Sequence, residues 1–237
     1  MESVKSQSYE VHINELAKAA LNQHVAQNKY SKIFLLVDEN TKLHCKPLFL
    51  DMFESAIDAV LEIPSGEEHK HIHTCLQLWE QLSRLDGDRK SLLINLGGGV
   101  LTDMGGFVAS TFKRGIDFIN IPTTLLSMVD ASIGGKTGVD LGSLKNQIGV
   151  INQPQMVLVF PEFLKTLDER QTKSGYAEML KHGLIQDKAY WNDLTENQNF
   201  TDPARIQKSI AIKNEVVLQD PTEQGLRKIM NFGHTLG

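Results

Sequence analysis

SLLINLGGGVLTD, residues 91–103, is the stretch that decides the fold. Residues 92–96 have the length and apolar content of a buried parallel strand, and three glycines, residues 97–99, follow without a spacer. Thr102 and Asp103 can then open a helix, whose free N–H groups and positive dipole end favour a bound phosphate group. The stretch therefore predicts a dinucleotide site at the end of a parallel strand.

A plain turn is the alternative at this stretch, because glycines between a strand and a helix often serve only to reverse the chain. The glycines also depart from the G-x-G-x-x-G fingerprint, since Thr102 stands where a third glycine would follow Gly97 and Gly99. These residues alone support the two interpretations about equally. Any dinucleotide site here is a variant one.

The composition describes an ordinary globular protein, with 41% hydrophobic and 22% charged residues among 237. A net charge of −5 without a basic block argues against a nucleic-acid partner. The two cysteines, Cys45 and Cys75, have no paired spacing and predict free thiols in a reducing compartment. No apolar run reaches ~18 residues and the start lacks the features of a secretion signal, so we expect no membrane association and a cytoplasmic location.

Strand patterns alternate with helical patterns through the first two thirds of the chain. Further strands are predicted at residues 32–37, 59–63, 117–121 and 156–160, and helices at residues 72–85 and 105–114. This alternation predicts a parallel, doubly wound sheet. Asp38, directly after the first strand, can hold a ribose hydroxyl or serve as a plain helix N-cap.

Residues 130–148, DASIGGKTGVDLGSLKNQI, form a second glycine-rich segment. It is not a Walker A loop, because Asp130 stands where the first glycine of that motif would be. Backbone N–H groups together with the ammonium groups of Lys136 and Lys145 could still hold an anion. We predict an anion-binding loop, with a flexible surface loop as the alternative.

Helical patterns dominate from Pro161 onward, at residues 161–167, 169–184, 203–218 and from about residue 225. We therefore predict two domains: an α/β domain with a parallel Rossmann-like sheet over residues 1–160, and an all-α domain over residues 161–237.

Two helices of this second part carry polar stripes. Glu178, Lys181 and His182 share one helix face, and Arg227 and Asn231 share another with His234. Glutamate and histidine are acceptable zinc ligands, but two ligands do not make a site and a lone histidine is usually structural.

Taken in order, GGGVLTDMGGF, IPTTLLSMVDASIGGKTGVD, LKNQIG, GYAEMLKHG and RKIMNFGHTLG resemble the motifs of 3-dehydroquinate synthases, from about Lys32 to Gly237. The resemblance implies an NAD-binding N-terminal domain and a helical C-terminal domain that is incomplete in this chain. It implies a cytoplasmic, homodimeric carbon–oxygen lyase that depends on NAD and on zinc or cobalt. Such enzymes convert the phosphorylated sugar acid 3-deoxy-D-arabino-heptulosonate 7-phosphate to 3-dehydroquinate and phosphate in the shikimate pathway, which leads to chorismate and the aromatic amino acids.

The resemblance also assigns roles to single residues. Cofactor contacts would come from Asp38, Asn40, Glu67, Lys70, Gly99, Val100, Asp103, Thr123, Thr124, Lys145, Phe163, Leu164, Lys165, Thr166 and Ser174. Substrate contacts would come from Asp130, Lys136, Asn146, Lys181, Lys213, Arg227, Asn231 and, across a dimer interface, Arg114. The catalytic residues would be Lys136, Lys181, Lys213 and Glu223, the last in proton transfer, with Glu178 and His234 as two of three metal ligands.

By the same resemblance, NAD takes a hydride from the substrate, phosphate is eliminated, NADH returns the hydride, and the ring opens and closes again as an aldol. Family members continue beyond Gly237 with two further histidines, one of them the third metal ligand. We therefore expect a truncated chain that alone binds metal poorly and has little or no synthase activity. Robust turnover with stoichiometric zinc would contradict this expectation.

Three other functions remain open on the sequence. A related sugar phosphate cyclase would share the NAD and metal sites, and its product would differ. A glycerol dehydrogenase would release NADH, although the many basic residues at matched positions argue against it. A noncatalytic nucleotide-binding module would bind NAD without metal uptake or turnover.

Overall fold

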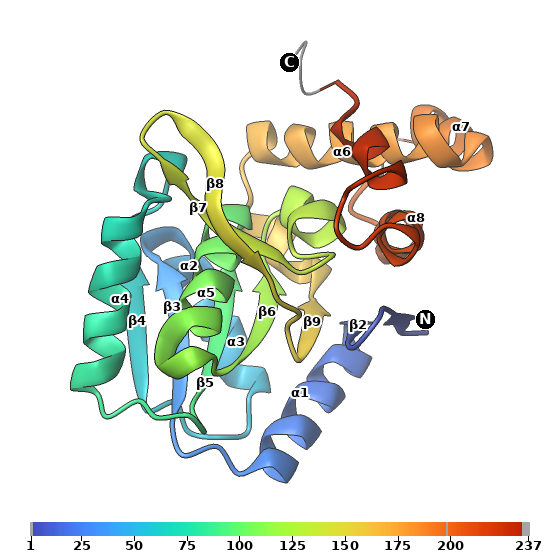
Figure 1. Ribbon diagram of the computed structural model, residues 1–237. Helices are drawn as coiled ribbons and strands as arrows, with labels where there is room; N and C mark the ends of the chain where they lie inside the picture. The colour runs from blue at the N-terminus through green and yellow to red at the C-terminus, as the bar shows by residue number, and fades with distance from the viewer. Residues whose placement is uncertain (1, 198, 234–237) are drawn as a thin grey trace.

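Four apolar strands lie side by side in the middle of a seven-stranded sheet, in a computed structural model that describes residues 2–197 and 199–233 (Figure 1). These strands are β3 (Ile33–Asp38), β5 (Leu92–Gly97), β6 (Asp117–Pro122) and β9 (Met156–Val159). Nearly every residue in them is buried, as parallel strands covered on both faces require. The predicted parallel α/β sheet is confirmed.

Shorter strands complete the sheet. The order is β1-β2-β9-β6-β5-β3-β4, with β1 (Val4–Lys5), β2 (Glu10–Ile13) and β4 (Ala59–Ile63). All neighbours pair in parallel except β1 and β2. β1 and β2 were not predicted, because neither carries a long apolar run; β2 joins the sheet through its pairing with β9.

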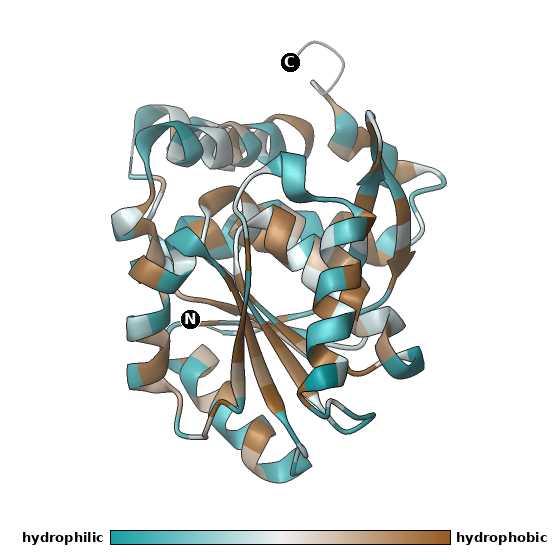
Figure 2. Cartoon of the chain, turned by 90° about the vertical axis from the view of Figure 1, so that its left-hand side faces the viewer, coloured by the Kyte–Doolittle hydropathy of each residue, from teal (hydrophilic) through white to brown (hydrophobic). Residues whose placement is uncertain are grey.

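Helices cover both faces of the sheet, whose apolar strands lie between more polar helix surfaces (Figure 2). α1 (Glu15–Asn28) and α3 (Lys46–Met52) pack on one face, and α4 (Ile72–Arg84) and α5 (Gly99–Thr111) pack on the other. α2 (Glu39–His44) follows β3 directly. The buried face of α4 runs through Cys75, Leu78 and Leu82, whereas Leu76 and Leu85 are exposed.

The glycine turn leads straight into α5. This helix begins at Gly99 with Gly98 as its N-cap, so the prediction that it opens at Thr102 was wrong. The Thr102 N–H donates to the Gly98 carbonyl at 3.0 Å, which shows that helical hydrogen bonding starts within the glycines. The first N–H groups of α5 are therefore presented where β5 ends.

The segment 130–148 was predicted to be a loop that binds an anion, and the loop conformation was wrong, whereas anion binding stays a prediction. Most of it forms an antiparallel ribbon of β7 (Lys136–Leu141) and β8 (Leu144–Ile151), preceded by the π-helical turn η3 (Ser127–Ala131). Gly138 and Gly149 face each other in this ribbon, and a Cβ on either would collide with backbone of the opposite strand. These two glycines are needed for strand pairing.

The rest of the chain is helical, as predicted, and among the described residues no strand follows Val159. It comprises η4 (Pro161–Thr166), α6 (Glu169–Gln186), α7 (Lys188–Glu196), α8 (Pro203–Gln219) and the short 3₁₀ helix η5 (Leu226–Asn231). Throughout residues 2–197 and 199–233, no helix has the length and apolar character needed to cross a membrane.

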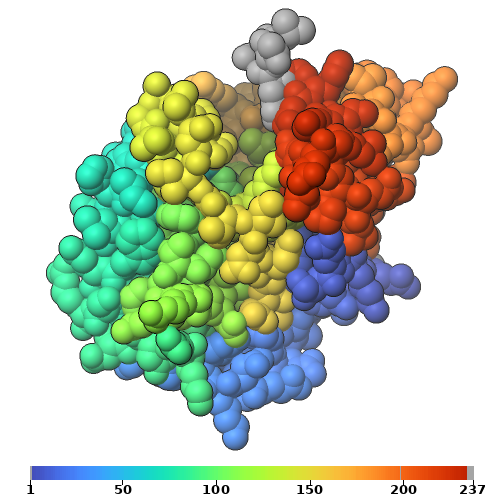
Figure 3. Space-filling model, viewed as in Figure 1, coloured from blue at the N-terminus to red at the C-terminus, as the bar shows by residue number. Residues whose placement is uncertain are grey.

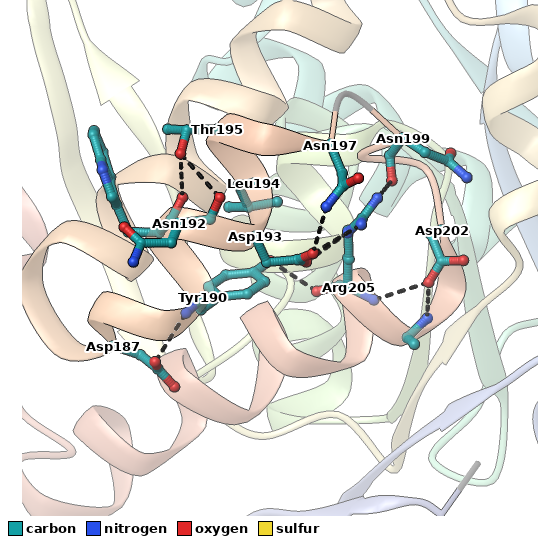
Figure 4. A network of polar contacts seen from close by, with 12 residues as sticks. Asp187, Tyr190, Asn192, Asp193, Leu194, Thr195, Asn197, Asn199, Asp202 and Arg205 are labelled. Atoms are coloured by element: carbon teal, nitrogen blue, oxygen red, sulfur yellow. Dashed lines mark hydrogen bonds and ion pairs between the residues drawn. The ribbon is translucent and has the colours of Figure 1, made fainter.

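A polar network fixes α7 to α8 (Figure 4). The Arg205 guanidinium binds both carboxylate oxygens of Asp193, at 2.7 and 3.0 Å, and donates to the Asn199 carbonyl at 2.7 Å. The Tyr190 hydroxyl donates to the Arg205 carbonyl at 2.8 Å. Bidentate contacts of this kind restrict both position and angle, so this network fixes the position of α8 relative to α7.

Candidate active site

Two hollows meet above the ends of the central strands. One, about 770 Å³, extends from β3 and β4 to the glycine turn, and the other, about 550 Å³, lies between the β7–β8 ribbon, α8 and η5. Asp103 and Ala131 line both hollows. In the space-filling view, the surface is hollowed between the ribbon and the C-terminal segment (Figure 3). Ligands of parallel sheets bind at such carboxyl ends of strands.

The larger hollow, named here the cofactor hollow, offers groups suited to a dinucleotide. A Cβ at Gly98 would approach Thr124 Cγ2 to 3.1 Å, and one at Gly99 would approach Ala131 Cβ to 3.2 Å, so side chains at these positions would narrow the hollow. No side chain caps the start of α5, which leaves its N–H groups for a ligand. This arrangement fits a pyrophosphate.

Asp38 caps α2, which confirms the N-cap interpretation. Its Oδ1 accepts the Thr41 N–H at 2.7 Å, and the Thr41 hydroxyl accepts the Asp38 N–H at 2.9 Å. Asp38 also lines the cofactor hollow, and its carboxylate accepts from the Thr41 N–H and hydroxyl through one oxygen, Oδ1. Capping and a ribose contact are therefore compatible at this residue.

Most residues assigned to the cofactor lie together. The cofactor hollow is lined by Asp38, Asn40, Glu67, Lys70, Gly99, Val100, Asp103, Thr123, Thr124, Phe163 and Thr166. Four others do not line it: Lys145, Leu164, Lys165 and Ser174. Leu164 belongs to the apolar core, whereas Lys145 binds Glu67 at 3.0 Å and Asp140 at 2.8 Å.

Lys70 joins the cofactor hollow to the ribbon. Its ammonium is buried, 2.6 Å from Asp103 Oδ2 and 2.7 Å from Asn146 Oδ1. Asn146 is held in turn by Asp140, whose Oδ1 accepts the Asn146 N–H at 2.8 Å. Burial raises the pKa of Asp103 to about 6, although the Lys70 ammonium opposes this rise. Asp140 was not predicted, since an aspartate in a polar strand gives no signal of such a contact.

Replacing Lys70 by methionine is expected to weaken NAD binding about tenfold and to destabilise the protein by ~3 kcal/mol, because Asp103 loses its buried partner. The folded-state pKa of Asp103 lies above its ordinary value, so ionisation of this carboxyl lowers stability as pH rises toward 6. Without Lys70 this pKa rises further. The loss in unfolding midpoint should therefore be larger at pH 8 than at pH 5.

Thermal unfolding and NAD titration of the complete gene product would check this prediction. Lys32→Met is the control, because the Lys32–Asp58 pair is well exposed and such pairs contribute little. An equal loss for Lys70→Met at both pH values would refute the account of Asp103.

The smaller hollow, named here the anion hollow, is lined by cations and amides from several elements. Lys136 from β7, Lys213 from α8 and Arg227 from η5 all line it, and so do Asn146 and Asn231. Arg227 is only 2% exposed, and among the described residues it has no carboxylate partner within ion-pair distance. A buried guanidinium without a counter-ion favours an anionic ligand.

Two acidic residues counterbalance these cations. Lys213 forms a close ion pair with Asp130, and Lys136 forms one with Glu223. Burial raises the pKa of Asp130, but the Lys213 ammonium outweighs it and holds this pKa well below the ordinary range. The Asn231 amide donates to Glu223 Oε1 at 2.7 Å. Glu223 is thus placed against the hollow by two side chains.

The charge on Lys136 should make anion binding dependent on pH. Partial burial, helped by the nearby Arg227 and Lys213 charges, lowers the pKa of Lys136 to about 8, although the Asp130 and Asp103 carboxylates oppose this fall. Its ammonium charge is therefore lost as pH rises through 8, and KM for a phosphorylated substrate is expected to rise several-fold between pH 7 and 9. An arginine at this position keeps its charge over that range. Lys136→Arg should flatten the profile, and parallel profiles for the two proteins would refute this prediction.

Three potential metal ligands converge beside the anion hollow. One ligand atom each of Asp130, Glu178 and His182 lies within 4.8 Å of the others. His182 is fully buried; its Nδ1 is 2.7 Å from Ser209 Oγ, and its Nε2 is 3.3 Å from Glu178 Oε1. His182 Nε2 has no hydrogen-bond partner among the described residues. Carboxylates beside an imidazole whose other nitrogen is held fit zinc or cobalt.

Lys181 lies on the same face of α6 as Glu178 and His182, as its spacing predicts. Its ammonium is 2.6 Å from Glu178 Oε1 and donates to the Met230 carbonyl at 2.5 Å. His234, the other expected metal ligand, lies outside the described residues. His182 was not assigned a role from the sequence, although its i, i+4 spacing from Glu178 pointed to it.

Arg114 lies apart from the other residues assigned to the substrate. It lines a separate hollow of about 480 Å³ at the start of β6, together with Arg89 and Asn152. Its φ of 71° is in the left-handed region, directly after Lys113 with a φ of 52°. Arg114 does not line the anion hollow of its own chain.

Comparisons with known proteins agree with this arrangement. Two family models match consecutive parts of the chain: 3-dehydroquinate synthase N-terminal at residues 60–174, and 3-dehydroquinate synthase C-terminal at residues 175–237. A 3-dehydroquinate synthase of Parabacteroides distasonis is 44% identical over 93% of this chain and 64% of its own length. One of Campylobacter jejuni subsp. doylei is 41% identical over 98% of this chain and 67% of its own length. The chain thus spans about two thirds of these curated relatives.

Solved structures share the fold. A 2-epi-5-epi-valiolone synthase from Streptomyces hygroscopicus, with NAD+ and Zn2+ bound, matches with a TM-score of 0.82 and 26% identity, covering 99% of this chain and 68% of that one. A 2-deoxy-scyllo-inosose synthase, complexed with carbaglucose-6-phosphate, NAD+ and Co2+, matches with a TM-score of 0.81 and 23% identity, covering 99% and 69%. The architecture is that of the sugar phosphate cyclases.

Proposed function

Because this chain belongs to the 3-dehydroquinate synthase family, we propose that it forms the cofactor and substrate hollows of an enzyme that makes 3-dehydroquinate and phosphate from 3-deoxy-D-arabino-heptulosonate 7-phosphate. One observation carries the proposal: the cofactor hollow and an anion hollow with three cationic side chains meet at Asp103. A phosphorylated sugar acid supplies two anionic groups for such cations. We place this reaction in the cytoplasm and in a homodimer.

The cofactor hollow would hold NAD, with Asp38 serving its adenosine end and the N–H groups at the start of α5 its pyrophosphate. Glu178 would hold a zinc or cobalt ion, with His182 and Asp130 in reach and with His234 as a further proposed ligand. When bound, the metal eases loss of an alcohol proton, and NAD accepts and later returns a hydride.

The chain's own residues would orient the substrate and move its protons. Lys213 and Arg227 would bind anionic groups and fix the sugar ring in the hollow. Glu223, held between Lys136 and Asn231, is placed to take or give a proton at the reacting end. Asn146 would add a donor from the wall of the hollow, and Lys181, which does not line it, would act from beside Glu178 and the Met230 carbonyl.

Arg114 is proposed to act on the substrate of a second subunit. It does not line the anion hollow of its own chain, and it lies in a neighbouring hollow with a second arginine, Arg89. In a homodimer it would reach the substrate phosphate across the interface.

Product analysis tests the proposed function. The complete gene product is incubated with NAD, zinc and one of three phosphorylated sugars: the heptulosonate 7-phosphate, sedoheptulose 7-phosphate or glucose 6-phosphate. We expect dehydroquinate from the first and no cyclised product from the others. A valiolone or inosose product would assign the protein to another cyclase, and net NADH release would indicate a dehydrogenase.

A further inference from the structure

The N-terminal segment reaches the anion hollow from outside it. Tyr9, directly before β2, is only 4% exposed, and its hydroxyl accepts the Gly134 N–H at 3.0 Å. This hydrogen bond joins residues 125 positions apart in the chain and is buried. A buried phenol hydroxyl normally has such a partner.

Gly134 also contacts the Arg227 guanidinium through its carbonyl oxygen. Its carbonyl accepts from both terminal nitrogens of the guanidinium, at 3.4 Å each, and the Pro221 carbonyl accepts from Nη1 at 2.8 Å. Gly134 has a φ of 99°, and a Cβ there would collide with Arg227 Nη2. The backbone at Gly134 therefore needs glycine and lies in direct contact with the guanidinium.

From these contacts we propose that Tyr9 is a positioning residue for anion binding, acting on Arg227 through the backbone of Gly134, whose N–H and carbonyl belong to the two successive peptide units that meet at its Cα. Tyr9 fixes the N–H side of Gly134, and Arg227 binds the carbonyl of the same residue. Movement of this backbone would change where the guanidinium points. The inference rests on the proposed function, because it takes the anion hollow to be the substrate site.

The same N-terminal segment also contacts α8, the helix that carries Lys213 of the anion hollow. The Lys5 carbonyl accepts from the side-chain amide of Asn214 at 2.8 Å, and Asn214 directly follows Lys213 in α8. β2, meanwhile, pairs with β9 in the sheet. The N-terminal segment thus contacts α8 directly and Arg227 of η5 through Gly134, and these contacts explain how it can affect a ligand it does not touch.

Tyr9→Phe in the complete gene product isolates the hydroxyl, because the ring and its packing remain. We expect KM for the heptulosonate phosphate to rise about tenfold, and the Kd for inorganic phosphate, measured by calorimetry, to rise by a similar factor. The kcat value should stay within about twofold, and the Kd for NAD should not change. Tyr30→Phe is the matched control, since it removes a hydroxyl that donates to Asp117 at 2.8 Å, away from both hollows.

A Tyr9→Phe protein with unchanged KM and unchanged phosphate affinity would overturn the inference. So would parallel losses of NAD and phosphate binding, because these would indicate general destabilisation. If the unsubstituted protein makes no dehydroquinate, the proposed function fails, while the phosphate titrations still decide the role of Tyr9. If the unsubstituted protein binds no phosphate, the inference fails with it.

Discussion

Glu178→Gln is expected to lower metal affinity at least ~100-fold and to remove nearly all synthase activity. Glu178 is buried beside His182 and Asp130, and the neutral amide keeps its shape while losing the charge that a divalent cation requires. Metal analysis after dialysis against a weak chelator, followed by turnover assays at saturating zinc, would measure both effects in the complete gene product.

Glu169→Gln is the matched control for this experiment. Glu169 lies on the same helix, α6, but it is exposed and pairs only with Lys173 at 2.6 Å. We expect its metal content and turnover to equal those of the unsubstituted protein. A Glu178→Gln protein that keeps stoichiometric zinc would mean that the metal binds elsewhere.

Arg227→Met is expected to lower kcat/KM by about 10²–10³-fold while leaving thermal stability nearly unchanged. The guanidinium is buried without a carboxylate partner among the described residues, so an apolar side chain of similar length removes a desolvated charge. We therefore expect Arg227 to contribute to substrate binding and little to stability. Steady-state kinetics and thermal unfolding of the complete gene product would measure the two quantities.

Arg205→Met should show the opposite pattern. Arg205 joins α7 to α8 through Asp193 and lines neither hollow, so its loss should lower the unfolding midpoint and leave KM nearly unchanged. If Arg227→Met instead lowers stability as much as Arg205→Met and keeps kcat/KM, then Arg227 is a structural residue.

The sheet could be predicted because its central strands carry largely apolar runs that end at or next to glycine, aspartate or proline. Leu92–Gly97 and Asp117–Pro122 are examples, and burial on both faces leaves no other explanation for such runs. β1 and β2 could not be predicted, since short polar strands become strands only through pairing with a distant neighbour such as β9.

At the β7–β8 ribbon, the local sequence pattern predicted a loop where the chain forms two strands. The glycines of residues 130–148 suggested a loop, but Gly138, with Gly149 opposite, allows two backbones to approach closely, and that need appears only once the strands are paired. The polar stripe on α6 was predicted by spacing alone. Its Ser209 partner for His182 lies 27 residues away, on α8, and no periodicity within one helix could reveal it.

Simultaneous measurement of inorganic phosphate, dehydroquinate and NADH tests the central claim most directly. The complete gene product is supplied with zinc, NAD and 3-deoxy-D-arabino-heptulosonate 7-phosphate. The structure and family predict one phosphate released for each dehydroquinate formed, with no accumulation of NADH, because the hydride returns to the substrate. NADH that accumulates in step with substrate loss, without phosphate release, would contradict the assignment.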